Sequence, residues 1–594
     1  MRINKLKYLF PVVALMLASC ESLLDEKPTN EWSDGYAWSV ASFAEGVLYN
    51  AYSAMPSRPD SYDNNFLDAA TDNALTNVYG SNVYKLSMGG MTISNNPIGN
   101  WSVCYKQLQY INSFLENGLT EATVYKKEDP TMNEIYKQRL KGEAYFLRAY
   151  WGFKLLQMYG GKTDDGQALG YPMFMHFITE EQAADYDNIT RSTYEECAEQ
   201  IMSDCDVAYE CLPASYTGDD EILGKKQLGR ATQSAALALK STVALYAASP
   251  AYQDNSVIVL QEMGKFNVVD SEAYKQKWER AAIAADEALK LSEFSTFYPL
   301  EAANLADTPV DAPKEFLLFS FFKSSGFEQR HFAPYYWGMA NNIPSQNLVD
   351  AFPMQNGYPI DRRESGYDKN NPYAGRDKRF YLNIYAHGLK YGNNGLPVDI
   401  LEGGKDSKTF SQYASRSGYY LAKFMSKDED MLNPVAKVNV KHYYPIMRRT
   451  EVWLNYAEAA NEAWGPTGKG EGCSYTAYQV IKMIREQSGG ITNDAYLDEV
   501  VNNQGKEGLR TLIQNERRIE LAFENQRYFD MRRWLLPLNE SVKGVSVVNE
   551  ANGLVYNYSE LEERRYNDIR YYYSPIPYEE CLKNPNLKNN LGWK

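Results

Sequence analysis

Residues 133–159 read NEIYKQRLKGEAYFLRAYWGFKLLQMY. The apolar side chains in this stretch recur every three or four positions, which is the period of an α-helix with one buried face. They are Leu140, Ala144, Leu147, Trp151, Leu155 and Met158. We therefore expect a long helix that packs its apolar side against other helices.

Similar periodic stretches lie on both sides of this one. Residues 230–249 are rich in alanine, and small side chains let helices pack closely, so this stretch and residues 272–291 are interpreted as a helix pair of the tetratricopeptide kind. A further helix is expected from Tyr194, where the Thr193 hydroxyl can cap the first turn. The remaining expected helices are at residues 101–115, 451–464, 475–485 and 509–534.

Residues 309–447 have a different character. Short apolar runs stand there among many Gly, Asn and Pro residues without a helical period, which is typical of loops with short strands. The end of the chain, residues 547–594, is expected to be mostly irregular. The predicted fold class is therefore mostly α: helix pairs at about 36–300 and 448–535 form a scaffold, and about 309–447 form a loop-rich insert containing short strands.

The composition excludes some classes of partner. The chain has 594 residues, with 61 Lys and Arg against 76 Asp and Glu, and a net charge of −15. Proteins that track nucleic acid hold its phosphates with an excess of Lys and Arg, so we expect no nucleic-acid partner. The 48 tyrosines outnumber Phe and Trp together, and tyrosine is an amphipathic contact residue.

The N-terminus has the pattern of a secretion signal. Arg2, Lys5 and Lys7 precede the uncharged stretch 8–18, which is too short to span a bilayer permanently. Cys20 follows Leu17-Ala18-Ser19, as in a lipobox, where a bacterial signal peptidase cuts before a lipid-bearing Cys. We expect a lipoprotein signal peptide at 1–19 and lipidation at Cys20; the alternative is a plain secretory signal.

Catalytic and metal-binding motifs are not found. The four histidines are far apart and form no HExxH motif, and there is no GxSxG motif and no dinucleotide fingerprint. The glycine-rich stretch 465–470 has the wrong spacing for a phosphate loop and is expected to be a turn. We therefore expect no catalytic residue, no metal and no cofactor; a carboxylate glycosidase needs only two acids and is the one enzymatic reading left open.

One charged helix face is expected to be structural. Glu516, Glu520 and Glu524 follow one another at four-residue spacing and would repel each other on one face. We expect Arg side chains from elsewhere to meet them in a buried or half-buried ion network, rather than a catalytic carboxylate cluster.

Several motifs, taken in order, resemble those of the SusD/RagB family of outer-membrane nutrient-binding lipoproteins. They are the lipobox, Gly142-Glu143-Ala144-Tyr145-Phe146-Leu147-Arg148-Ala149, Gly229-Arg230-Ala231-Thr232, residues 516–524 (ERRIELAFE) and Pro575-Ile576-Pro577. The resemblance covers nearly the whole mature chain, and it departs from the family at 161–170, where a longer polar stretch follows the glycine turn.

This resemblance implies a single SusD-like domain at 20–594. The lipid on Cys20 would hold it on the outer face of the outer membrane, where it would partner a SusC-like TonB-dependent transporter. It would capture oligosaccharides and deliver them to that transporter without catalysing a reaction. A peptide cargo is the alternative within the same transport system, and a helical scaffold for protein partners is a further one.

Sugar recognition needs flat aromatic faces together with amides or charged groups that hydrogen bond around them. Two stretches supply both. The expected ligand-binding residues are Asp72, Asn73, Asn77, Tyr79 and Tyr84 in the first and Arg330, Tyr335, Tyr336 and Trp337 in the second. Trp337 is the preferred candidate, because Pro334 can hold its segment extended. The alternative is that these rings fill gaps between the loops and the helical scaffold. His331 is expected to be a hydrogen-bonded surface histidine.

Overall fold

The structure, a computed structural model, describes most of the chain. The described residues are 34–183, 188–302, 305–306, 313–324, 326–392, 395–427 and 439–594. The expected signal peptide at 1–19 and the expected lipidation site Cys20 lie outside the described residues. In the part of the chain that is described, no helix is long and apolar enough to cross a membrane.

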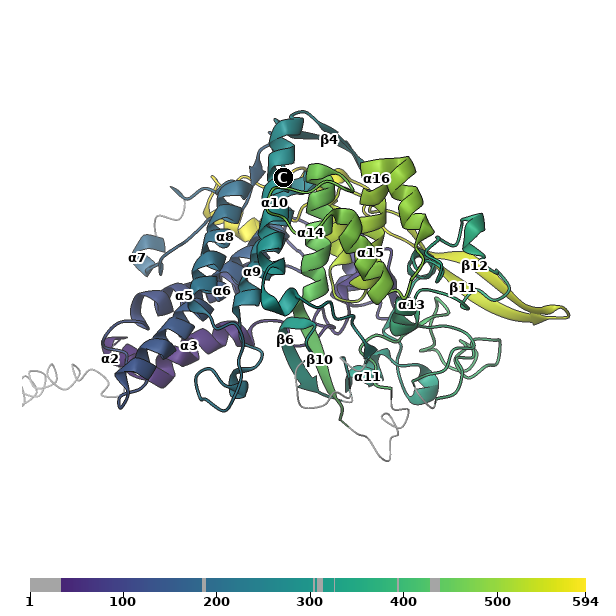
Figure 1. The fold of residues 1–594 in the computed structure, drawn as a ribbon, viewed down its shortest axis with the longest axis horizontal. Helices are drawn as coiled ribbons and strands as arrows, with labels where there is room; N and C mark the ends of the chain where they lie inside the picture. The colour runs from purple at the N-terminus through teal and green to yellow at the C-terminus, as the bar shows by residue number, and fades with distance from the viewer. Residues whose placement is uncertain are drawn as a thin grey trace, which may run out of the picture.

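Helices make up the body of the molecule, so the predicted mostly α fold class is confirmed (Figure 1). The longer helices are α3 (Ala41–Ser53), α5 (Trp101–Asn117), α6 (Pro130–Tyr159), α8 (Tyr194–Cys211), α9 (Gln233–Ala248), α10 (Ser271–Leu289), α14 (Arg449–Trp464), α15 (Ala477–Gln487) and α16 (Ala495–Glu520). The shorter ones are α2 (Asp34–Ser39), α4 (Asn82–Ser87), α7 (Glu180–Ala183), α11 (Gly326–His331), α12 (Gln346–Ala351), α13 (Lys378–Asn383), α17 (Arg527–Arg533) and α18 (Tyr578–Lys583).

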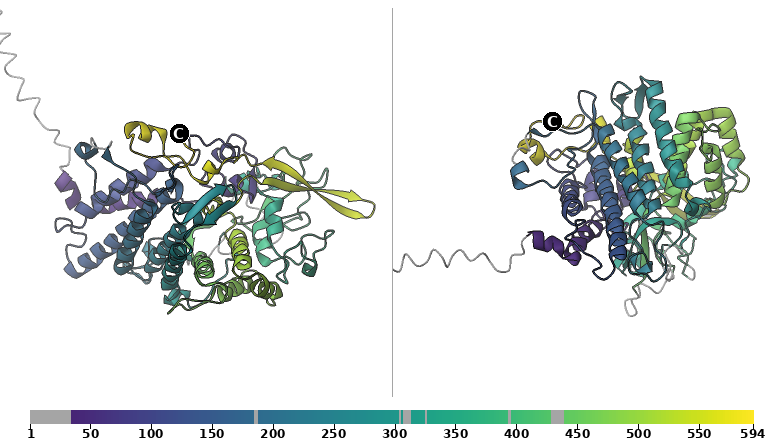
Figure 2. Two further views of the ribbon diagram at one scale, coloured as in Figure 1. Left: turned by 90° about the horizontal axis from the view of Figure 1, so that it is seen from above. Right: turned by 60° about the vertical axis from the view of Figure 1, so that its left-hand side comes forward.

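The long helices stack in nearly their chain order. Each helix contacts the next one in the order α3, α5, α6, α8, α9, α10 and α14. Helix α14 also contacts α15 and α16. Figure 2 shows these helices side by side. The insert separates α10 from α14 in the sequence, yet the two helices contact each other directly. The helices before and after the insert therefore form one scaffold.

Local capping explains where two of these helices begin. Asp129 accepts a hydrogen bond from the Met132 amide at 3.0 Å, and Pro130 occupies the first turn of α6. At α8 the Thr193 side chain and Glu196 form a reciprocal capping box, as the sequence predicts for Thr193.

The helix predicted at 509–534 is wrong in its start and in its continuity, whereas its end agrees with the end of α17 at Arg533. α16 starts earlier, at Ala495, and bends at Gly505, where φ is +58°. It ends at Glu520, because Phe523 and Asn525 both adopt left-handed backbone conformations that no α-helix continues. The chain becomes helical again in α17.

The strands form six separate antiparallel pairs in the described residues. They are β1 (Ala74–Thr76) with β7 (Asn342–Pro344), β2 (Gly161–Lys162) with β3 (Ala168–Leu169), β4 (Ile258–Glu262) with β5 (Lys265–Val268), β6 (Phe316–Lys323) with β10 (Lys441–Arg448), β8 (Ile384–Tyr385) with β9 (Tyr420–Leu421), and β11 (Ser541–Glu550) with β12 (Gly553–Glu563). Five of these strands lie within or at the edge of the predicted insert.

The C-terminal region is more regular than expected. Strands β11 and β12 form a long hairpin that extends away from the helical body (Figure 1), so the expectation of a mostly irregular segment from residue 547 is wrong up to Glu563. Gly553 follows the two-residue turn with φ of +117°, a conformation that favours glycine. Val545 and Val547 of β11 are buried, while their neighbour Ser546 is exposed, which is the alternation of a half-buried strand.

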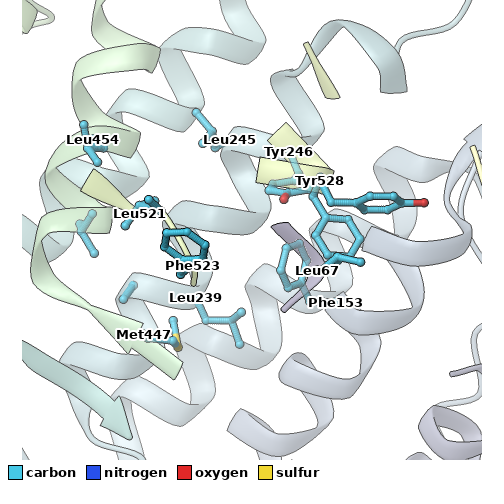
Figure 3. Packing of buried hydrophobic residues seen from close by; sticks show 14 of the residues in the cluster. Leu67, Phe153, Leu239, Leu245, Tyr246, Met447, Leu454, Leu521, Phe523 and Tyr528 are labelled. Atoms are coloured by element: carbon cyan, nitrogen blue, oxygen red, sulfur yellow. The ribbon is translucent and has the colours of Figure 1, made fainter. Parts of the chain in front are cut away.

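One hydrophobic core joins the frame, the insert and the C-terminal part (Figure 3). Phe153 of α6, Leu239 of α9, Met447 at the end of β10 and Phe523, which follows α16, all belong to this buried cluster, and Leu239 is drawn next to Met447. All four side chains are buried. The loop-rich insert is therefore packed onto the frame through shared apolar contacts.

The predicted buried ion network is confirmed. Arg448, at the end of β10, lies 3.0 Å from Glu520 and 2.9 Å from Glu524, and Arg379 of α13 lies 2.8 Å from Glu516 and 3.1 Å from Glu520. All five side chains are buried. Both arginines come from the insert or its edge, so the network fastens the insert to the helical frame.

Candidate functional site

The two stretches predicted to bind ligand lie next to each other. β1 pairs with β7 so that Leu75 faces Ile343, and the Asn77 amide donates to the Asn341 carbonyl at 2.8 Å. Residues more than 250 positions apart are thus joined by backbone hydrogen bonds. This pairing places Tyr79 and the segment that ends with Trp337 on neighbouring parts of the fold.

A third segment, which the sequence did not indicate, adjoins them. Asn77 Nδ2 donates to the carbonyl of Ala340 at 2.9 Å and reaches the carbonyl of Ala414 at 3.5 Å. The guanidinium of Arg416 lies 5.3 Å from the centre of the Tyr79 ring and also donates to the Thr76 carbonyl. Residues 410–416 therefore belong to the candidate site.

Exposed aromatic rings gather on these three segments. Trp337 is 52% exposed, Tyr79 58% and Tyr335 39%, and residues 410–416 add Phe410 and Tyr413 at 53% and 48%. Contacts link the rings to their surroundings: Tyr335 lies 6.5 Å from Phe410, and Tyr79 packs edge-on against the half-buried Tyr84 at 5.1 Å. We call these five exposed rings the aromatic surface.

Trp337 is held outward by a tight turn and not by an extended segment. Pro334–Tyr336 form a 3₁₀ turn, and the Trp337 amide donates to the Pro334 carbonyl at 2.9 Å. Trp337 itself has φ of +59°, a left-handed conformation that costs a non-glycine residue about 1 kcal/mol or more. The expectation that Pro334 keeps this stretch extended is therefore wrong.

Tyr335 and Tyr336 have opposite environments. The Tyr335 ring is exposed and lies 5.2 Å from the ammonium of Lys405. Tyr336 is buried, packs against Tyr391 at 5.1 Å, and its hydroxyl accepts a hydrogen bond from the Leu396 amide. Tyr336 therefore supports the turn, as the gap-filling alternative expects, and its ring is not offered to solvent.

Asp72 and Asn73, which directly precede β1, are buried. Asp72 forms ion pairs with Arg518 at 3.0 Å and Arg527 at 2.8 Å, and Arg518 also donates to the Asn73 side chain. Burial alone would raise the pKa of the Asp72 carboxyl, but the two arginines hold it well below its usual range. These two residues connect β1 to the helical frame and leave no polar group free for a ligand.

Arg330 is half-buried and forms an ion pair with a buried aspartate, Asp60. Its guanidinium lies 2.7 Å from Asp60, and His331 Nε2 lies 3.3 Å from the same carboxylate. His331 is fully buried and not on the surface as expected. Burial would raise the pKa of Asp60, but the hydrogen bond with His331 and the nearby Arg330 lower it to about 2.

A cavity of about 410 Å³ lies beside the aromatic surface. It is bounded by residues 400–418 and by the hairpin β11–β12, and Arg416 lines it while also facing Tyr79. Ser407, Ser415, Ser546 and Ser559 line it as well. Its volume lies in the range of small-molecule sites, roughly 300–1,000 Å³, and hydroxyls can both donate and accept hydrogen bonds with a sugar.

Acids near this surface are engaged by cations. Glu562 contacts both Arg416 and Arg564, and the buried Asp406 lies 2.7 Å from Lys405. Among the described residues, no group of three or more His, Cys, Asp or Glu side chains could hold a metal ion. The geometry thus offers stacking faces and hydrogen-bonding groups, which suit binding of a polyhydroxylated ligand.

Two family models match the chain. Residues 320–593 match SusD_RagB, described as the SusD family, and residues 22–245 match a SusD-like model described as starch-binding and associating with the outer membrane. The chain is similar to the SusD-like protein P38 of Formosa agariphila, with 22% identity over 97% of this chain and 96% of that protein. SusD-like protein P2 of the same organism is 33% identical over 26% of each chain.

Solved structures agree with these matches. A SusD-like protein from Bacteroides fragilis superposes with a TM-score of 0.71 at 25% identity, covering 96% of this chain and all of that one. A SusD-like carbohydrate-binding protein from the same species superposes with a TM-score of 0.66 at 20% identity, covering 92% and 99% of the two chains. The motifs, the two family models and the fold together identify this chain as a member of the SusD family.

Proposed function

We propose that this protein captures an oligosaccharide at the aromatic surface and delivers it to a SusC-like TonB-dependent transporter. The lipid on Cys20 would hold it on the outer face of the outer membrane. The protein would act by binding alone, without catalysis. The observation that carries the proposal is the β1–β7 pairing, which joins the two aromatic, amide-rich stretches, of whose rings Tyr79, Tyr335 and Trp337 are exposed.

The chemistry of the surface supports a glycan. Rings of Tyr79, Tyr335 and Trp337 can stack on the C–H faces of sugars, and Arg416 and Asn77 lie within the same segments as hydrogen-bonding groups. The buried predicted residues Asp72, Asn73 and Tyr336 would position this surface without touching the ligand. A solved SusD-family relative bears a carbohydrate-binding description, which supports the same ligand class here.

Isothermal titration of residues 21–594, which lack the signal peptide and the expected lipidation site, against a panel of polysaccharides and peptides tests the proposal. We expect glycan binding that Trp337→Ala weakens about tenfold or more, with no product formed. Tyr49→Ala is the matched control, because Tyr49 is an exposed ring on α3. Binding of peptides alone would favour the peptide alternative, and release of sugar by the purified protein would favour a glycosidase.

A further inference from the structure

A second cavity, of about 280 Å³, opens on another part of the frame. It lies between the first turn of α5, the C-terminal third of α6 and the segments 54–62, 444–446 and 524–529. It shares no lining residue with the cavity beside Arg416. Five aromatic residues line it among polar and aliphatic ones: Tyr62, Tyr150, Trp151, Tyr444 and Phe529.

An amino group without a counter-ion lines this cavity. Lys154 Nζ donates one hydrogen bond, to Gln157 at 3.0 Å, and lies 5.4 Å from the centre of the Tyr150 ring. No ion pair of Lys154 within 4.0 Å occurs among the described residues. The acid that acts on it from farther away is Glu451, which is itself paired with Arg517 at 3.6 Å. An ammonium has three donors, so two remain for a ligand.

The buried Lys423 shows what a purely structural lysine looks like in this protein. Its ammonium lies 2.7 Å from Glu524 and donates to the carbonyls of Ala522 and Glu520. All three of its donors therefore have acceptors. Lys154 has one hydrogen-bond acceptor, Gln157, and lines an open cavity. Its environment therefore suits binding of an anion.

The N-terminus of α5 adds positive potential to the same cavity. The helix runs for 17 residues, and its N-cap residue Asn100 makes no capping hydrogen bond with its side chain. The backbone amides of Asn100 and Trp101 both donate to the Tyr159 hydroxyl at 2.9 Å. Asn100 and Val103, in the first turn, both line the cavity. The amino end of a helix carries a partial positive charge that attracts anions, and this feature is independent of Lys154.

The charge balance favours a single negative charge on the ligand. Glu524 also lines the cavity, but its oxygens are bonded to Arg448 and Lys423. One ammonium and one helix end can compensate one carboxylate, whereas a dianion would face Glu524 without further cations. The aromatic walls suit an organic body, and the volume suits a molecule about the size of one monosaccharide or one amino acid.

We propose that this cavity binds a small organic monocarboxylate through Lys154 and the amino end of α5. Two sources could supply such a ligand: a sugar acid, such as a uronic acid, or a free amino acid. This site is separate from the aromatic surface, so it holds whether or not the aromatic surface binds oligosaccharides.

Titration calorimetry of the mature protein with glucuronate, galacturonate and a panel of L-amino acids, with neutral glucose and galactose as comparisons, tests the proposal. We expect at least one carboxylate to bind and its neutral counterpart not to bind. Lys154→Met should weaken this binding about tenfold or more, because a charge-assisted hydrogen bond is lost. The matched control is Lys141→Met, on the exposed side of the same helix, which should leave binding unchanged.

A second variant covers the case in which Lys154→Met fails to fold. Val103 is 46% exposed and lines the cavity, so Val103→Trp should fill it and abolish carboxylate binding while Lys154 stays in place. Selective binding of sugar acids or of amino acids would identify the source. Absence of binding by every carboxylate, or binding that survives both variants, would overturn the proposal.

Discussion

The ion network around Arg448 and the aromatic surface around Trp337 are built in opposite ways. In the network, charged side chains are buried and every acid meets an arginine, as Arg448 meets Glu520 and Glu524. In the aromatic surface, large rings such as Tyr79 and Trp337 are exposed to solvent. The comparison teaches that the charged motif at residues 516–524 stabilises the fold, while the exposed rings on loops are the candidates for ligand binding.

The largest expected effect is on the network. Arg448→Met would leave Glu315, Glu520 and Glu524 buried with a partner lost, which typically costs 3–5 kcal/mol, about 4 kcal/mol here. Urea unfolding measures this loss of unfolding free energy. The control is Lys583→Met, which breaks an exposed ion pair with Glu580 and should cost under about 1 kcal/mol. Equal small losses in both variants would show that the network does not stabilise the fold.

A smaller and pH-dependent effect on the unfolding free energy is expected at Asp60, which pairs with Arg330 and His331. The pKa of Asp60 is lowered from 3.8 to about 2 in the folded protein, so its charge stabilises the fold above pH 3.8 and this contribution is lost as the pH falls towards 2. Asp60→Asn should therefore cost about 2 kcal/mol at neutral pH. Urea unfolding at about pH 7, 5 and 3 should show the difference between variant and wild type shrinking only at the lowest pH. A difference that stays constant with pH would contradict this account.

Within the aromatic surface, the expected effect falls on binding and not on folding. Tyr79→Ala removes an exposed ring, so we expect affinity for the glycan to fall about tenfold and the unfolding free energy to change by under about 0.5 kcal/mol. Tyr49→Ala is a close control, since Tyr49 is 59% exposed and Tyr79 58%. Titration calorimetry and urea unfolding on the same samples separate the two quantities. Equal affinities of the two variants would place the glycan elsewhere.

The smallest expected effect runs in the opposite direction. Trp337 adopts a left-handed backbone, which glycine tolerates without strain. Trp337→Gly should therefore raise the unfolding free energy by up to about 1 kcal/mol, although it removes the preferred stacking ring. Urea unfolding of this variant beside Trp337→Ala, which keeps the strain, checks the prediction. A clear loss of stability in Trp337→Gly would show that the ring holds the turn in place.

The sequence predicted the parts of the fold that follow a period. The spacing of Leu140, Leu147 and Trp151 predicted α6, and the spacing of Glu516 and Glu520 predicted the ion network. These patterns are local, so they can be read without knowing the fold. The hairpin β11–β12 also carried a local signal that was missed, because an Asn-Gly pair between apolar stretches is typical of a hairpin. In the structure Asn552 is the second turn residue and Gly553 begins the next strand.

The candidate site depended on contacts that no local pattern shows. Tyr335 and Tyr336 are neighbours of the same kind, and only the 3₁₀ turn decides that one is exposed and the other buried. Residues 410–416 join the site through contacts of Asn77 and Tyr79 with Ala414 and Arg416, more than 330 positions away. Loop segments without a period leave such long-range placement open.

The most direct test of the account combines the three rings of the aromatic surface that the sequence predicted. Titration calorimetry of the bound glycan would compare the wild-type protein with the triple variant Tyr79→Ala, Tyr335→Ala, Trp337→Gly. We expect no measurable glycan binding by the triple variant and cooperative urea unfolding within about 1 kcal/mol of wild type. Unchanged affinity in the correctly folded triple variant would contradict the claim that this surface binds the ligand.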